Sequence, residues 1–301
     1  MLSSFVFYIG VLSDNCNDWA MNEECDKNPS FMWQNCRKEC ENAGSVQKTY
    51  DDRCFIEKDE GFLKKGFLSD LFSRAVSNFP ELEPEFISLN PPIVVFDKFT
   101  TPEEADTFVK MGRGKYTRST GLEVKSDGTY KSVETQIRTS SNTWCQHKYC
   151  LTNPDVERVT DRVSNVTGVP SHNFEFAQLL YYHACKSERD INCSFYRRHH
   201  DYISADKYKN QGVRILTMFI YLNDVEQGGF TSFYMNQTGL SVQPKKGRAI
   251  LWPNVLENDP HTIDTRTEHE AHPVLKGEKY GANFWIHQYD FKTPHYKGCT
   301  Q

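Results

Sequence analysis

The sequence predicts an α+β protein: a domain built on a β-sandwich or barrel, preceded by a small cysteine-rich module. Two amphipathic helical patterns, at 100–114 and 154–166, are followed after residue 172 by β-rich runs that turn residues separate. N-terminal to these helical and strand patterns, residues 14–44 carry four cysteines and few apolar residues. Disulfides rather than a hydrophobic core must therefore stabilise this module.

The overall composition is that of an ordinary globular protein. Of the 301 residues, 38% are hydrophobic and 25% charged, which is enough apolar material for one large domain and a small one. The formal net charge of −5 gives no overall basic surface, so nucleic acid is not an expected partner.

Local patterns predict the elements of the large domain in order. The mixed, charged segment 45–90 is interpreted as a linker with a short helix, ending at the proline pair 91–92. A strand is expected at 93–99, and the helix at 100–114 begins with Thr-Pro and ends with Gly. In the helix at 154–166, Val156, Val159 and Val163 lie on one face. Strands then follow at 174–182, 212–224, 228–234, 247–253 and 280–291.

Ten cysteines indicate disulfide bonds and an oxidising compartment. Cys54 and Cys299 stand alone. The other eight lie close in sequence, as Cys16 and Cys25, Cys36 and Cys40, Cys145 and Cys150, and Cys185 and Cys193. Zinc binding is the competing interpretation, but the chain has no C-x2-C pair. Sequons at Asn165, Asn192 and Asn236 agree with a secreted glycoprotein.

The N-terminal residues 2–12 form an apolar stretch that is too short to span a bilayer. The stretch is compatible with the core of a signal peptide, although no Lys or Arg precedes it, and residues 1–13 are interpreted as a signal-peptide remnant. An incomplete start of the sequence is the alternative. No later segment has the apolar length expected of a transmembrane helix.

The segment YRRHHDY, residues 196–202, carries the first candidate metal ligands. Alternate residues of a strand share a face, so His199 and Asp201 are expected to point one way and His200 the other. One imidazole and one carboxylate make two thirds of the 2-His-1-carboxylate triad that is typical of non-haem Fe(II). This spacing alone is weak evidence, and a solvated polar strand end is the alternative.

The C-terminal part of the chain offers a third ligand and a cation. The candidates for the second histidine are His261, His269, His272 and His287. Alternation along the last strand places five residues on one face: Lys279, Gly281, Asn283, Trp285 and His287. A lysine inside a barrel is costly unless an anion pairs with it. Iron and lysine in one barrel would suit a dicarboxylate, which can chelate the metal at one end and meet the lysine at the other.

Six segments between about residues 91 and 291 together resemble the catalytic domain of prolyl 4-hydroxylases of the collagen, plant and algal type. They are RTSSNTWC, VTGVPSHNFEFAQLLYY, YRRHHDY, VRILTMFIYLNDVEQGGFTSF, PKKGRAILWPN and HEAHPVLKGEKYGANFWIH. The resemblance implies a double-stranded β-helix (jelly-roll) core with supporting helices over residues 91–301. It also implies an Fe(II)- and 2-oxoglutarate-dependent dioxygenase that needs L-ascorbate to rescue oxidised iron.

The resemblance also implies a ligand set. The H-x-D of the family corresponds to His199 and Asp201, and its distal histidine, which stands four residues before a Pro-Val pair, corresponds to His269. The lysine ten residues further on, which binds the distal carboxylate of 2-oxoglutarate, is Lys279, and Tyr182 matches the tyrosine that assists it.

Further residues match family positions less specifically. Tyr196, Arg214 and Trp285 match positions near the iron and the substrate, although each also has a purely structural interpretation. Thr217 is a weaker candidate for contact with the co-substrate. His200 is interpreted as substrate-side or structural rather than as a ligand.

Two regions depart from the family pattern. The segment HACKSERDINCSF, residues 183–195, replaces a tight Gly-Gln turn, and Cys185 and Cys193 predict a disulfide-closed loop beside the site. The pair Cys145 and Cys150 is similarly expected to fix a loop, near the entrance of the site or with a purely structural purpose.

The cysteine-rich block at 14–44 resembles a partial ShK-toxin-like (ShKT) domain. Its cysteines match the second to fifth of that family's six, and the outer bridge is missing. The resemblance implies the pairs Cys16–Cys36 and Cys25–Cys40.

These observations together predict an enzyme that hydroxylates peptidyl proline, with a proline-rich or collagen-like peptide as substrate, in the lumen of the endoplasmic reticulum. Two alternatives stay open: a hydroxylase of another peptidyl residue such as lysine on the same fold, and a secreted binding protein whose ShKT-like module is the functional part. A partner subunit cannot be identified from the sequence.

Overall fold

A large antiparallel sheet forms the centre of the protein. The computed structural model describes residues 15–45, 54, 66–124, 130–185, 193–235 and 238–300. The large sheet has eight strands in the order β1-β2-β13-β9-β18-β7-β6-β3. Their bounds, in that order, are Pro84–Leu89, Pro92–Phe96, Ala249–Pro253, Arg214–Tyr221, Glu278–His287, Gln178–His183, Ser141–Trp144 and Thr117–Arg118.

A smaller sheet lies against one face of the large one. Its four strands have the order β12-β11-β16-β8, with bounds Thr238–Val242, Thr231–Met235, His269–Ala271 and Tyr196–His199. Side chains of both sheets, including Phe233 from the small sheet and Tyr182 and Trp252 from the large one, share one buried cluster. Two antiparallel sheets that face each other across such an interior form the expected double-stranded β-helix.

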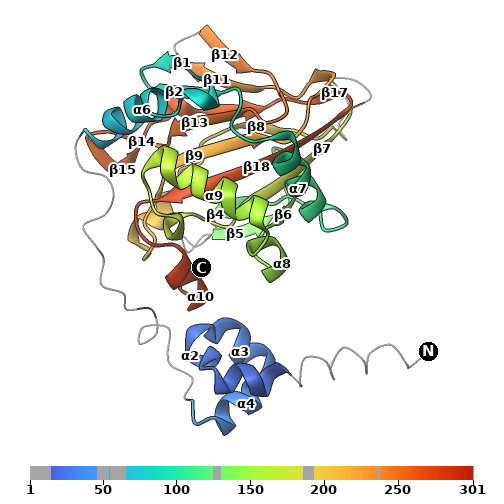
Figure 1. Ribbon diagram of the computed structural model, residues 1–301, viewed down its shortest axis with the longest axis vertical. Coiled ribbons are helices and arrows are strands. Elements are labelled where there is room, and N and C mark those ends of the chain that lie inside the picture. The colour runs from blue at the N-terminus through green and yellow to red at the C-terminus, as the bar shows by residue number, and fades with distance from the viewer. Residues whose placement is uncertain are drawn as a thin grey trace.

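Three helices cover the opposite face of the large sheet. They are α6 (Phe67–Ser77), α7 (Pro102–Gly112) and α9 (Pro154–Thr167). As the sequence predicts, Val156, Val159 and Val163 are buried on one face of α9. They join a second buried cluster with outward-facing strand residues such as Phe284. Figure 1 shows α9 and α7 on the same side of the large sheet, where α7 contacts β6 and β7.

Shorter elements complete the domain. Three hairpins or strand pairs extend from the sheets: β4 (Gly121–Val124) with β5 (Tyr130–Val133), β10 (Gln227–Gly228) with β17 (Val274–Lys276), and β14 (Val255–Leu256) with β15 (Asp259–Ile263). The short helices are α8 (Lys148–Leu151), α10 (Lys292–Tyr296), η1 (Pro80–Leu82), η2 (Ser171–Asn173), η3 (Ser204–Tyr208) and η4 (Thr265–Thr267).

The segment 45–90, expected to be a linker, contains part of the folded domain. The short helix expected there is α6, but β1 also falls within it and pairs with β2. Leu71, Phe72 and Leu82 are buried in the cluster between the large sheet and the helices that cover it. Because this segment covers one end of the large sheet, its apolar residues belong to the core rather than to a connection. Residues 46–53 and 55–65 lie outside the described part.

The described part of the N-terminal module is helical: residues 15–21 are followed by the short helices α2 (Glu24–Lys27), α3 (Pro29–Asn35) and α4 (Arg37–Asn42). Its buried residues are mainly the four cysteines and Met32. The disulfides are Cys16–Cys36 and Cys25–Cys40, as the ShKT resemblance implies. The module therefore depends on these cross-links in place of a large core.

All ten cysteines form disulfides, which confirms the interpretation of the cysteines as cross-links rather than zinc ligands. Cys145–Cys150 and Cys185–Cys193 pair as expected. Cys54 pairs with Cys299, a link between distant parts of the chain that the sequence left unassigned. Most of the loop that Cys185–Cys193 closes, residues 186–192, lies outside the described part.

Of the three sequons, only Asn165 lies in the described part of the chain; Asn192 and Asn236 do not. Asn165 is exposed on α9, whereas Thr167 of the same sequon is buried and donates a hydrogen bond to the Val163 carbonyl. Among the described residues, no helix combines the length and apolar character needed to cross a membrane.

Candidate metal centre

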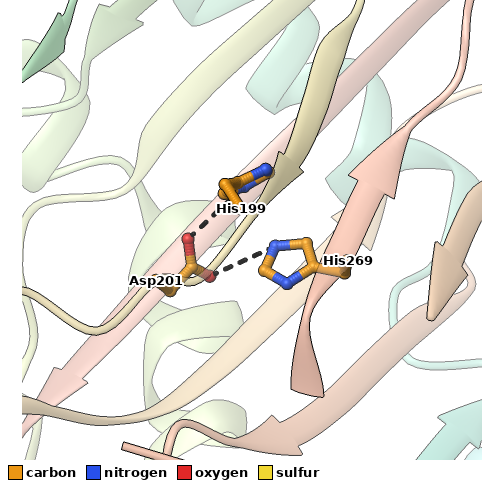
Figure 2. Close-up of side chains that lie close together, drawn as sticks. All are labelled: His199, Asp201 and His269. Atoms are coloured by element: carbon orange, nitrogen blue, oxygen red, sulfur yellow. Dashed lines mark ion pairs between the residues drawn. The ribbon is translucent and has the colours of Figure 1, made fainter. Parts of the chain in front are cut away.

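Three potential metal ligands meet between the two sheets. His199 ends β8 and His269 begins β16, and the two residues are direct partners in the antiparallel pair. Asp201 follows β8 after one residue. Its carboxylate oxygens lie 3.8 Å from His199 Nε2 and 3.7 Å from His269 Nε2 (Figure 2). Each of the three residues offers one ligand atom, and these three atoms all lie within 4.8 Å of one another.

Hydrogen bonds to the backbone orient both imidazoles. His199 Nδ1 lies 2.6 Å from the Arg197 carbonyl, and His269 Nδ1 lies 3.0 Å from the Thr267 carbonyl. A carbonyl can only accept, so each Nδ1 must carry the proton. The Nε2 lone pairs are then free for a metal, which is the arrangement that hydrogen bonds to the other ring nitrogen give metal-binding histidines.

The carboxylate is held by a short chain of polar side chains. Thr217 on β9 donates to Asp201 Oδ2 at 2.8 Å, and Asn254 donates to the Thr217 hydroxyl at 2.9 Å. Burial alone would raise the pKa of Asp201, but His269, His199 and Arg214 outweigh it, so the pKa is lowered and the carboxylate is ionised. Burial, followed by the neighbouring His269, lowers the pKa of His199 well below its ordinary value.

This donor set fits Fe(II). Two imidazoles and one carboxylate at the ends of adjacent strands make up the facial triad of non-haem iron oxygenases, and one face of an octahedral ion remains for other ligands. In the described part of the chain, this is the only group of three or more His, Cys, Asp or Glu side chains with metal-binding geometry.

The remaining candidate histidines lie outside the triad. His287 contacts Glu175, His272 stacks on Phe230 with ring centroids 4.1 Å apart, and His261 lies on β15. His200 was expected to face away from Asp201. Instead, it is half-buried and lines the same cavity as Asp201, because β8 ends at His199 and strand alternation does not continue through His200.

Lys279 is a buried cation that no anion meets in the described part of the chain. Its side chain is fully buried, and among the described residues its Nζ has no hydrogen-bond partner. The ammonium instead faces the rings of Tyr182, Phe219 and Tyr221, 4.9, 5.3 and 5.3 Å from their centroids. Burial lowers the pKa of Lys279 to about 7. An orphaned ammonium between the sheets fits the carboxylate of a bound ligand such as 2-oxoglutarate.

The strand pairing explains how Lys279 and Tyr182 come together. They are direct partners in the β18–β7 ladder, and both point into the interior between the sheets. Two residues on, Gly281 makes room for the Phe219 ring, since a Cβ at that position would come within 2.5 Å of it. The lysine therefore sits in an aromatic pocket that the sheet itself forms.

A second polar cluster borders the metal centre, and its acid is absent from the sequence prediction. Glu175 accepts hydrogen bonds from Arg214 Nε at 2.5 Å and His287 Nε2 at 2.9 Å. Burial opposes ionisation, yet Arg214 and His287 together lower the pKa of Glu175 to about 2. An acid inside the apolar run FEFAQLL was the available signal, because buried acids are nearly always paired.

The three aromatic and cationic candidates lie together on one cavity. Tyr196 stacks on His199 with centroids 3.4 Å apart, and the Arg214 guanidinium lies 3.7 Å from the Trp285 ring centroid. Together with Asp201, these residues line a cavity of about 520 Å³. The sequence reasoning missed two other residues of its wall, Arg138 and Trp144. Thr217, expected to contact the co-substrate, instead has its hydroxyl engaged by Asp201 and Asn254.

Comparison with known proteins agrees with this geometry. The model of the 2OG-Fe(II) oxygenase superfamily matches residues 182–287. Prolyl 4-hydroxylase 1 of Arabidopsis thaliana is 33% identical over 221 residues, covering 69% of this chain and 72% of the relative. The alpha-1 subunit of Gallus gallus prolyl 4-hydroxylase is 31% identical over 212 residues, covering 70% of this chain but 38% of the relative.

Among solved structures, the viral collagen prolyl hydroxylase of Paramecium Bursaria Chlorella virus-1 is similar with a TM-score of 0.46 and 24% identity, covering 65% of this chain and 94% of that protein. The sequence relationship to the Arabidopsis enzyme is the stronger finding, because it combines 33% identity with most of the length of both chains. The chain therefore belongs to the prolyl 4-hydroxylase family of 2-oxoglutarate- and Fe(II)-dependent oxygenases.

Proposed function

We propose that this protein hydroxylates peptidyl proline at C4 and couples the reaction to the conversion of 2-oxoglutarate and O2 into succinate and CO2. One oxygen atom enters the proline hydroxyl group and the other enters succinate. The observation that carries the proposal is the ammonium of Lys279, which has no hydrogen-bond partner among the described residues and shares the interior between the sheets with the His199, Asp201 and His269 triad.

In this proposal His199, Asp201 and His269 hold Fe(II), and the bound iron supplies the activation of O2. Lys279 pairs with the distal carboxylate of 2-oxoglutarate, and the neighbouring Tyr182 contacts the same group. Such a pair would relieve the cost of burying Lys279 without an anion. Burial raises the pKa of Tyr182 to about 12, so its hydroxyl keeps its proton and can donate to the carboxylate.

We assign Thr217 to positioning rather than to co-substrate binding. Its hydroxyl donates a hydrogen bond to the Asp201 oxygen that faces His269. The same hydroxyl oxygen accepts a hydrogen bond from the Asn254 side-chain amide. The two bonds fix one carboxylate oxygen, so the other can turn toward the metal. Orientation of a ligand by such a partner typically contributes tenfold to a hundredfold in metal affinity.

The cavity of about 520 Å³ beside Asp201 suits a peptide segment. Tyr196, Arg214 and Trp285 would contact the proline and its neighbours there. Apolar rings suit the pyrrolidine, and the Arg214 guanidinium, held by Glu175, offers donors for peptide carbonyls. L-Ascorbate is proposed as the reductant that returns oxidised iron to Fe(II).

The reaction is tested by mass spectrometry of peptide products formed with Fe(II), 2-oxoglutarate and ascorbate. Poly(L-proline), collagen-like and lysyl peptides are compared, and succinate release is measured in parallel. A gain of one oxygen on proline, matched by succinate, is the expected result. Hydroxylation confined to lysine, or no peptide-dependent succinate despite bound iron, would overturn the proposal.

We propose that the protein works in the oxidising lumen of the endoplasmic reticulum. Five disulfides support this location, because they persist only where thiols are oxidised. The N-terminal module is proposed to be a ShKT-type appendage without its outer bridge. Immunolocalisation of the full chain, with cytosolic staining as the contrary result, tests the assignment.

A further inference from the structure

A second cavity adjoins the one beside the metal centre. It measures about 430 Å³ and shares three wall residues, Trp144, Ile203 and Arg214, with the metal-side cavity. None of the three proposed metal ligands lines it. A ligand that occupies the metal-side cavity can therefore continue past Arg214 into this second space, which we call the flanking cavity.

The flanking cavity contains a buried acceptor that nothing in the described chain satisfies. Gln211, which lies just before β9, is 2% exposed and lines the cavity, and its Oε1 has no hydrogen-bond partner among the described residues. Buried carbonyl groups are normally paired, and an orphan of this kind is costly. A donor from a ligand would complete it.

The charged groups around the flanking cavity are already paired. Asp206 lies 3.0 Å from the Lys209 ammonium, and Glu175 is bonded to both Arg214 and His287. These side chains therefore need no charged group of a ligand as a partner. Its apolar wall includes Phe176, Ala205 and Phe291. The chemistry that fits is a neutral group with apolar surface and one N–H or O–H donor.

The C-terminal segment builds one wall and is tied in place. His295 and Thr300 line the cavity, and the Thr300 carbonyl accepts from Lys209 Nζ at 3.4 Å. The next residue toward the N-terminus, Cys299, is cross-linked to Cys54, whose carbonyl accepts from Asn210 at 2.9 Å. Gln211, which carries the unpartnered acceptor, therefore directly follows Asn210, whose side chain is hydrogen-bonded to Cys54 of this cross-link.

We propose that the flanking cavity binds a peptide residue next to the reacting proline, and that Gln211 Oε1 accepts the backbone N–H of that residue. The proposal rests on the proposed peptide-hydroxylating function and adds a specificity rule to it. Proline has no backbone N–H. The residue bound at Gln211 must therefore be one other than proline, so a peptide that alternates proline with another residue should bind better than poly(L-proline).

Peptide affinity under anaerobic conditions tests this rule apart from catalysis. The protein is loaded with Fe(II) and 2-oxoglutarate, and the dissociation constant of a labelled alternating Ala-Pro peptide is measured by fluorescence anisotropy. N-Methylalanine is then placed at one alanine at a time, which removes a single N–H. One methylated position should weaken binding to the wild-type protein by about tenfold, the loss expected for one hydrogen bond.

The variant Gln211→Leu should bind the unmethylated peptide about tenfold more weakly and lose its sensitivity to methylation at that one position. Gln211→Glu, which keeps an acceptor oxygen, should retain that sensitivity. Gln288→Leu is the matched control, since Gln288 is also buried and its Oε1 has no partner within the described ranges, but it lines neither cavity. Circular dichroism confirms that each variant is folded.

Two outcomes would overturn the inference: equal peptide affinity of Gln211→Leu and the wild-type protein, or a methylation penalty that persists in the variant. Aerobic turnover with the same peptide separates this result from the proposed function. Hydroxylation without any dependence on Gln211 would refute only the flanking-cavity assignment. Gln211-dependent binding without hydroxylated product would refute only the proposed reaction.

Discussion

At the scale of single residues, the metal centre depends on imidazoles whose tautomer the backbone fixes. We expect His269→Ala to lower the affinity for Fe(II) by at least about a hundredfold and to abolish succinate formation, because it removes one of three ligands rather than a supporting contact. His272→Ala is the control, since His272 is a nearby histidine that stacks on Phe230 outside the triad. Iron binding is measured by anaerobic titration, and near-normal binding by the His269 variant would remove it from the ligand set.

Thr217 makes a separate prediction. Thr217→Val keeps the shape of the side chain but removes the donor to Asp201 and the acceptor for Asn254. We expect Fe(II) affinity to fall by roughly tenfold while the KM for 2-oxoglutarate, measured at saturating iron, stays unchanged. Thr217→Ser should restore both bonds and the affinity. A selective increase in the KM for 2-oxoglutarate would instead return Thr217 to the co-substrate site.

Because Lys279 is buried, the stability of the folded protein should depend on pH. Burial lowers its pKa from 10.5 to about 7, so between these values the unfolded chain binds the proton that the folded chain releases. The stability of the ligand-free protein should therefore rise as pH increases from 7 toward 10. The penalty is fully present below pH 7, where Lys279→Met should be more stable than the wild-type protein by on the order of a few kcal/mol.

Denaturant unfolding of both proteins across this pH range measures the difference. The gap between the variant and the wild-type protein should narrow at high pH, where the wild-type lysine is neutral in both states. 2-Oxoglutarate should raise the melting temperature of the wild-type protein but not that of Lys279→Met. A gap that does not change with pH would contradict the assignment of the cost to the ammonium.

The sequence predicts single residues well where a local rule applies. The H-x-D spacing indicates His199 and Asp201 as a pair, and they do meet His269, although the strand ends at His199 and alternation does not explain why Asp201 joins them; Lys279 follows from the cost of a cation inside a barrel. Glu175 and Asn254 escape such rules, because their partners lie far away in sequence: Glu175 meets Arg214 and His287 only after three strands have assembled. His200 shows the limit of alternation, which fails where the strand ends.

At the scale of elements, local sequence signals predict helices and single strands, but they do not predict which strands pair. The helix α7 and the strand β9 follow from caps and apolar runs, and both are present close to their expected bounds. The strand β1 (PEFISL) lies in the segment that the sequence predicts to be a linker, because that segment is charged and of mixed composition. Only its pairing with β2 and its contact with α6 make it part of the core, and neither is visible in a local window.

The start of α7 provides an element-scale prediction. Thr101 caps the helix: its Oγ1 accepts from the Glu104 backbone at 3.2 Å, and the Glu104 carboxylate accepts from the Thr101 backbone at 2.9 Å. Thr101→Ala should lower the free energy of unfolding by about 1 kcal/mol, whereas Thr101→Ser should keep the cap. Urea unfolding measures both, and equal stability of the alanine and serine variants would refute the cap. Because α7 packs on the helix face of the large sheet, peptide affinity should not change.

At the scale of the whole molecule, two faces of one sheet have separate purposes. One face packs under α6, α7 and α9, and the other lines the interior that holds the triad and Lys279. The choice of partner for Cys54 also belongs to this scale. Disulfide connectivity depends on which segments the fold brings together, so a sequence can indicate that cysteines are paired without identifying distant partners.

The bridge Cys54–Cys299 spans 245 residues and closes a loop that includes the whole oxygenase domain. In the loop-entropy model, such a cross-link restricts the unfolded chain strongly, and we expect Cys54→Ser/Cys299→Ser to lower the free energy of unfolding by roughly 5 kcal/mol at most. Cys16→Ser/Cys36→Ser is the contrasting pair, because its loop of 20 residues lies within the N-terminal module and should leave unfolding of the oxygenase domain unchanged.

The same double variant connects the bridge to binding. Because Thr300 lines the flanking cavity next to Cys299, loss of the bridge should weaken binding of the Ala-Pro peptide while the KM for 2-oxoglutarate stays constant. Guanidinium unfolding at two protein concentrations and anaerobic anisotropy measure the two effects. If the midpoint falls but peptide affinity does not, the bridge stabilises the fold without shaping the cavity. If neither changes, the C-terminal segment is held without the bridge, by contacts such as the hydrogen bond from Lys209 to the Thr300 carbonyl.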